Sequence, residues 1–128
     1  MIEEAYVSIE IAKLLKEKGF DEGCFFVVNS ISECMMPVSW STTNSDIKDE
    51  KANLITLPTL QMAMRWLREE KGIAVIPILS SVLDNEKFLW DVKITVAKTN
   101  ESYRQGWTYE SYEQACETAI KYSLENLI

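Results

Sequence analysis

The chain has 128 residues, of which 47% are hydrophobic and 26% are charged, and its formal net charge is −7. This composition is typical of a globular protein rather than a disordered one, and the acidity argues against generic binding to nucleic acid or anionic membranes. Histidine is absent, which removes the usual general base and the commonest metal ligand. We find no catalytic motif, and we expect one α+β domain over residues 1–128 that needs no cofactor and no metal.

The first predicted elements are a helix over residues 8–18 and a strand over Cys24–Asn29. Ser8 is a suitable N-cap and Gly19 a suitable stop for the helix. Its apolar stripe consists of Val7, Ile11, Leu14 and Leu15. The strand is dense in β-forming residues, and its continuous apolar run predicts burial on both faces.

The next segment, residues 36–41, is a candidate second strand with Val38 and Trp40 at the period of a strand. Pro37 lacks a backbone donor, so it would confine this strand to the edge of a sheet. Residues 42–53 are polar, and we expect them to form a solvated loop.

The helix predicted over residues 58–72 has the clearest boundaries in the chain. Pro58 fits its first turn, and Gly72 fits its C-terminal stop. Its main stripe is Leu60, Ala63, Met64 and Leu67. Met62 and Trp66 form a second apolar stripe, roughly 120–150° further around the helix. Burial of this stripe in the core is the favoured interpretation, because Trp is mostly buried. The alternative makes Met62 and Trp66 the candidate partner surface.

Two strands follow at hairpin spacing. Residues 73–79 are expected to form a buried strand in which Pro77 requires an edge or a bulge, and residues 84–87 supply a turn. Apolar and polar side chains alternate from Phe88 to Val96, the pattern of a half-buried antiparallel strand. On that strand, Asp91 and Lys93 are expected on the open face.

The C-terminal part begins with a polar connection over residues 98–105, and residues 106–109 are a candidate further strand. Ser111 to Gln114 match the capping-box pattern, so the last helix is predicted over residues 112–127. The strands occur in hairpins rather than in alternation with helices. This order predicts an antiparallel or mixed sheet of about four strands, with three helices packed mainly on one face.

From Pro58 onward, the helix–strand–strand–strand–helix order is similar in outline to double-stranded-RNA-binding domains. The basic helix end and the binding loop of those domains are missing here. The last helix is acidic, with Glu113, Glu117 and Glu125. Because binding to a phosphate backbone depends on Lys and Arg, this helix argues against RNA binding.

The three cysteines are Cys24, Cys34 and Cys116. Their odd number and the lack of a CxxC spacing argue against disulfides and against a zinc site, and favour a reducing cytoplasm. The acidic start differs from a signal peptide. No apolar run approaches the roughly 20 residues of a membrane span. We therefore expect a cytoplasmic protein without membrane contact.

Three segments together resemble a group of small uncharacterised proteins from phages and mobile elements of gut anaerobes. They are Ala12–Asp21, Thr59–Arg68 and Tyr109–Ile128. The resemblance implies a stand-alone cytoplasmic accessory protein of mobile DNA, and it transfers no functional residues. Separately, the strand–turn–helix that starts with Tyr109-Glu-Ser-Tyr-Glu-Gln-Ala is similar to part of HicB-type antitoxins, which would imply an antitoxin-like regulator.

Three functions follow from these observations. The first is a non-catalytic protein-binding module, whose partner is a basic protein or a second copy of the chain. The second is a small enzyme or ligand-binding domain that uses carboxylates, Cys34, or Tyr103 and Arg104. The third is nucleic-acid binding by stacking on Trp and Tyr, which the net charge opposes.

Overall fold

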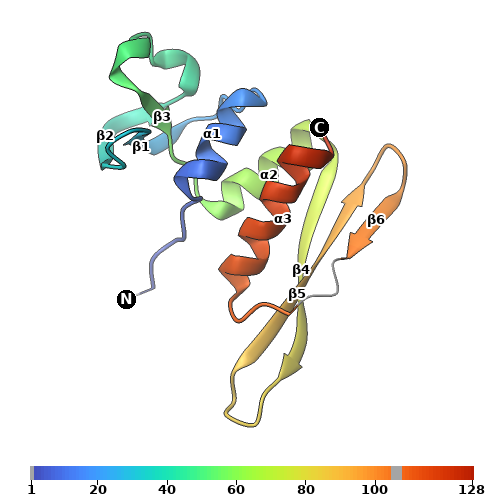
Figure 1. Cartoon of the computed structure of the whole chain (residues 1–128). Coiled ribbons are helices and arrows are strands. Elements are labelled where there is room, and N and C mark those ends of the chain that lie inside the picture. Colours follow the sequence, from blue (N-terminus) through green and yellow to red (C-terminus); the bar gives the residue numbers. More distant parts are fainter. Residues whose placement is uncertain (1, 105–107) are drawn as a thin grey trace. The chain divides into compact units, whose positions relative to one another are not determined.

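The computed structural model describes residues 2–104 and 108–128, which contain three α-helices and six strands (Figure 1). The predicted α+β class is confirmed. The sheet prediction needs a correction, because the strands form two three-stranded antiparallel sheets instead of one sheet of about four strands. The chain divides into two compact units, unit 1 (residues 1–59) and unit 2 (residues 60–128). One domain over residues 1–128 stays a prediction.

Unit 1 contains one helix and the sheet with strand order β2-β1-β3. Its elements are α1 (Ile9–Glu17), β1 (Cys24–Asn29), β2 (Met35–Thr42), two 3₁₀ turns, η1 (Asn44–Asp46) and η2 (Glu50–Ala52), and β3 (Leu54–Thr56). Ser8 is the N-cap of α1, as predicted, and its hydroxyl accepts a hydrogen bond from Ile11 N at 3.2 Å. The helix packs against β3.

Strand β1 has its predicted bounds, and the predicted burial on both faces holds at Val27 and Val28 but not at Phe25. Val27 and Val28 are buried, whereas 62% of the Phe25 surface is exposed. The reason lies in the pairing with β2, where the register shifts between Cys24 and Phe26. An irregular partner cannot cover the side chain that lies at the shift.

The predicted loop over residues 42–53 is tied to the rest of unit 1 through Asn44. Its side-chain amide donates to Phe20 O at 2.9 Å, and its side-chain carbonyl accepts from Thr56 N at 3.0 Å. Thr56 belongs to β3, a strand that the sequence analysis missed. Three residues are too few to show a period, so β3 is defined by its pairing with β1.

Unit 2 contains two helices and the sheet with strand order β4-β5-β6. Its elements are α2 (Leu60–Glu70), β4 (Ile73–Val82), β5 (Phe88–Val96), β6 (Glu101–Arg104) and α3 (Tyr112–Asn126). Helix α2 packs on β4, and α3 packs on both β4 and β5 and against α2. This unit therefore has the helix–strand–strand–strand–helix order, with β6, which lies within the predicted polar connection, as its third strand.

Several boundaries in the second half of the chain differ from the prediction, and one of them is the end of β4, which lies at Val82 rather than at residue 79. Helix α2 begins at Leu60, because the residues before it pair with the N-terminal segment: Val7 N donates to Pro58 O at 3.0 Å, and Thr59 forms a bridge with Tyr6. Strand β6 occupies part of the predicted polar connection. Its side chains are polar, and pairing with β5 defines it.

The candidate strand over residues 106–109 falls partly outside the described residues. Of this segment, Tyr109 forms an isolated bridge with Trp90. The last helix is confirmed, since Ser111 is its N-cap and accepts from Gln114 N at 3.0 Å.

Both prolines that were predicted to require an edge lie on edge strands. In an antiparallel ladder, alternate residues direct their backbone groups toward the neighbouring strand. Cys34 O accepts from Asn29 N at 3.0 Å, and Pro37 is three residues further along. Residues that are an odd number of positions away from a bonded residue direct their backbone groups away from the neighbouring strand. The nitrogen of Pro37, which carries no hydrogen, therefore faces the open side of β2.

The same reasoning applies to Pro77 in β4. Gly72 O accepts from Ala97 N at 2.9 Å, and Pro77 is five residues further along, again an odd offset. The register of β4 also shifts between Leu79 and Ser81, which is the alternative that the sequence analysis had named. Each proline therefore sits where it interrupts no ladder bond.

Substitution of Gly72 tests whether a residue in the left-handed conformation ends α2. Its φ of 65° lies in the left-handed region, while a Cβ there would be at an ordinary 3.6 Å from the Ala97 Cβ. We predict that Gly72→Ala lowers the free energy of unfolding by about 1–2 kcal/mol, since the cost is one of backbone conformation. Gly72→Asn should lose less, because Asn tolerates this region. Urea unfolding measures both, and equal stability of Gly72→Ala and wild type would refute the assignment.

Candidate functional site

The proposed partner surface of Met62 and Trp66 lies on α2. Met62 is half-buried, and only 6% of the Trp66 surface is exposed. The Lys71 Nζ lies over the Trp66 ring, 5.4 Å from its centroid. The burial of Trp66 favours the core interpretation for this side chain, and the partner surface formed by the pair stays a prediction.

The cysteines fall into two classes. Cys24 and Cys116 are buried, and Cys34 is exposed at the start of β2. Burial raises the pKa of the Cys24 thiol, and it raises the pKa of the Cys116 thiol to about 11. Since the thiolate is the nucleophile, the two buried thiols are unreactive at neutral pH.

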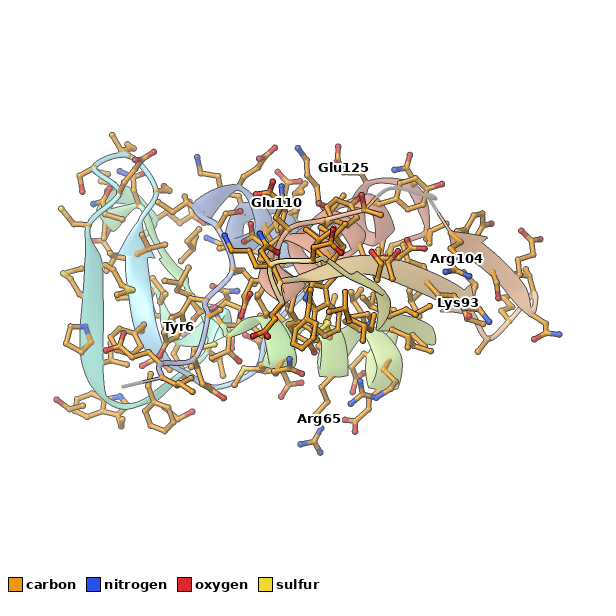
Figure 2. The ribbon with its side chains drawn as sticks, turned by 90° about the horizontal axis from the view of Figure 1, so that it is seen from below. Tyr6, Arg65, Lys93, Arg104, Glu110 and Glu125 are labelled. Carbon is orange, nitrogen blue, oxygen red and sulfur yellow. The ribbon has the colours of Figure 1, made fainter. Side chains whose placement is uncertain are left out.

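The polar residues of β5 and β6 form a salt bridge. Arg104 Nε lies 2.7 Å from Asp91 Oδ2, and Asp91 Oδ1 accepts from Val92 N at 2.7 Å. Asp91 is buried, which corrects its expected exposure on an open face, because Arg104 and the strand backbone surround its carboxylate. Figure 2 shows Lys93 and Arg104 on neighbouring strands, where they are direct partners in the β5–β6 register.

Tyr103 was the other candidate on β6. Its hydroxyl donates to Glu101 Oε2 at 2.7 Å, and this hydrogen bond raises the pKa of Tyr103. Its ring packs against Tyr122 of α3, with the centroids 6.2 Å apart. These contacts place Tyr103 on the helix-covered face, whereas Arg104 lies on the opposite face. The two candidates are therefore not brought together in one site.

Unit 1 has a cleft of about 260 Å³ beside β3. It is lined by Lys16, Ser30, Ile47, Asp49, Glu50, Asn53, Leu54 and Ile55. Several polar groups of this lining bond locally: Ser30 N donates to Asn53 O at 2.8 Å, and Asp49 Oδ1 accepts from Lys51 N at 3.0 Å. The cleft is smaller than most ligand pockets. These hydrogen bonds of Ser30 and Asp49 hold the loop itself.

Within residues 2–104 and 108–128, no group of three His, Cys, Asp or Glu side chains is arranged to hold a metal ion. No helix in this part of the chain combines the length and the apolar character that crossing a membrane requires.

A set of exposed apolar side chains with a regular register lies on the β4–β5 hairpin. Leu79 is paired with Trp90, and Val82 is paired with Phe88. Since side chains alternate along a strand, Phe88 and Trp90 share a face, and their two partners lie on it as well. We call these four residues the arm face. Leu79 is 48% exposed, Val82 58% and Phe88 52%, while Trp90 is half-buried.

The arm face is the continuation of the face that the helices cover. Trp90 is in edge-to-face contact with Tyr112, the first residue of α3, with the ring centroids 5.3 Å apart. Further along β5, Val92 and Ile94 are buried. Toward the turn, the hairpin extends past the N-terminal end of α3 (Figure 1). The sheet is therefore longer than the helical layer that covers it.

A second group of exposed apolar residues lies on β2 and includes Trp40, which is 74% exposed. Met35 and Met36 are successive residues, so they point to opposite faces. Trp40 lies between Pro37 and Thr42, where the pairing with β1 is irregular. Met35 and Met36 therefore do not share one face, and the register with β1 assigns no partner to Trp40, so the arm face is the better-defined candidate.

No family model, no curated protein and no solved structure matches this chain. The alternation of β5 predicts that Phe88 and Trp90 lie on one side of their strand, but it does not predict the exposure of the arm face. A signal was available: the apolar alternation of β5 starts at Phe88, next to the turn, whereas β4 turns polar at Ser80 and Ser81.

Alkylation of the folded protein tests the two classes of cysteine. We predict that iodoacetamide at neutral pH modifies Cys34 and leaves Cys24 and Cys116 intact, because burial shields them and keeps them protonated. Peptide mass spectrometry locates the adducts, and the denatured protein serves as the control in which all three react. Modification of Cys116 as fast as Cys34 would contradict the burial.

Substitution of Arg104 tests the salt bridge. We predict that Arg104→Leu lowers the free energy of unfolding by about 1–3 kcal/mol, because the buried Asp91 carboxylate loses its charged partner. Arg65→Leu is the matched control, since its pair with Glu69 is exposed on both sides and Figure 2 shows Arg65 pointing away from α2. Denaturant unfolding of both variants measures the difference. Equal losses would show that Asp91 does not need Arg104.

Proposed function

We propose that this protein is a non-catalytic protein-binding module, and that the arm face of unit 2 is its binding surface. The observation that supports this proposal is the exposure of Leu79, Val82 and Phe88 on one face of the hairpin, next to the half-buried Trp90. Contiguous exposed apolar residues of this kind mark interaction sites on soluble proteins. The accessory role in a phage or mobile element rests on the resemblance of the sequence.

The geometry of the arm suits recognition. The Phe88 and Trp90 rings are 6.3 Å apart in an edge-to-face arrangement. Trp90 is also held by two backbone hydrogen bonds with Tyr109, at 2.8 and 2.7 Å. Aromatic side chains that are already held in place lose little conformational freedom on binding, and they dominate the energetics of many interfaces.

A cytoplasmic location is part of the proposal. All three cysteines are free thiols, and one of them is exposed. This state is the one that a reducing compartment maintains.

A photo-crosslinking amino acid at position 82 tests the function. In the protein's own host cells, we expect Val82 replaced in this way to give covalent adducts with a partner protein. Ile76 is the matched control, because it is 47% exposed and lies on the opposite face of the same strand. Mass spectrometry identifies the adducts. The proposal fails if position 82 gives no adduct, or only those that position 76 also gives.

A further inference from the structure

We infer that the occupant of the arm face is an amphipathic helix of a partner protein, with Lys or Arg flanking its apolar stripe. This inference rests on the proposed function and names the chemistry of the partner. Three observations carry it: the blocked edge of β4, the helical layer that ends at Trp90, and the carboxylates at both ends of the arm face.

The edge of β4 is unsuited to pairing with an added strand. Pro77 presents no N–H on the open side, and the register shift after Leu79 breaks the spacing of the remaining donors. Prolines and bulges are the means by which sheets prevent pairing at their edges. The β4 edge therefore disfavours an added strand, and the face of the hairpin is the better docking surface.

The face itself is already packed with helices at the end away from the turn. Helix α3 covers β4 and β5 as far as Trp90, and α2 lies beside α3 on the same sheet. The uncovered remainder presents Leu79, Val82 and Phe88 to the same side. A helix placed there would extend the existing layer, and helix-on-sheet packing is the arrangement that this face adopts elsewhere in unit 2.

The charges around the arm face are acidic. Asp84 and Glu86 lie in the turn that joins the two strands, and both are exposed. At the other end, Glu110 and Glu113 are exposed beside the two tyrosines that contact Trp90.

The one cation of the turn does not share this face. Lys87 is paired with Leu83 through the hydrogen bond from Leu83 N to Lys87 O at 2.8 Å. This pair continues the ladder by one position beyond Val82 and Phe88, so the Lys87 side chain lies on the opposite face from Phe88. The carboxylates at the two ends of the arm face are therefore not offset on this face by Lys87, and they complement Lys or Arg on a partner.

Three synthetic peptides of about 18 residues, long enough to be helical in water, test the inference. The first has a leucine stripe flanked by lysine, the second has the same stripe flanked by glutamate, and the third has the composition of the first with the stripe scrambled. We expect the full chain to bind the first peptide roughly tenfold more tightly than the other two, as measured by fluorescence anisotropy.

Variants of the chain locate the binding site. Phe88→Ser and Val82→Ser should each weaken binding of the first peptide roughly tenfold, and Ile76→Ser on the opposite face should not change it. Replacing Glu110 and Glu113 by Gln should also weaken binding and reduce its dependence on salt. Thermal unfolding of each variant identifies any substitution that weakens binding by destabilising the protein. If one of the two arm variants unfolds, the other still tests the binding site.

The outcomes separate this inference from the proposed function. Equal binding of the first two peptides would overturn the charge assignment, and no binding of any peptide would overturn the helix. Equal binding of the scrambled peptide would show general attraction to an acidic protein, and so would binding of the first peptide that neither arm variant weakens. Either result would overturn the inference. In each case, crosslinking at Val82 decides independently whether the arm binds a protein.

Discussion

The pairing of β4 with β5 is the interaction on which the rest of unit 2 depends. It runs from Ile73 paired with Val96 to Val82 paired with Phe88, and it passes through one register shift without separating the strands. One end is buried beneath the helices, and the other end is open to solvent. A two-stranded hairpin alone is marginally stable in water, so the exposed end is held by the buried end. The arm face exists because the ladder is longer than the core.

Much of the fold could be predicted from local chemistry. The alternation of β5, the capping serines of α1 and α3, and the positions of Pro37 and Pro77 all depend on neighbours in sequence, and all were read correctly. The misses have another origin. Strands β3 and β6 are short or polar and are defined by the strands they pair with. Helix α2 starts late because Pro58 and Thr59 pair with a segment far away in the chain. No local pattern contains that information.

The residues of the candidate site also divide into features that local sequence predicts and features that depend on distant parts of the chain. Trp66 and Phe88 are both large apolar residues in clear periodic patterns, yet Trp66 is buried and Phe88 is half exposed. Periodicity assigns a side chain to a face, but it does not say how far the covering layer extends along that face. The length of α3 relative to β5 decides this, and it becomes known only when both elements are placed together. For Asp91 the missing fact was its partner, Arg104 on the next strand.

The order of the strands in the two sheets differs in a way that bears on how the chain folds. In unit 2, β4, β5 and β6 are neighbours in both sequence and space, so each pairing closes a short loop. In unit 1, β3 must return beside β1 after the chain has formed β2 and two turns, and Asn44 then joins Phe20 to Thr56 across the same gap. Closing a long loop costs more entropy, and folding slows as contacts become less local. The hairpin layer of unit 2 therefore has the kinetic advantage, and the sheet of unit 1 is the slower step.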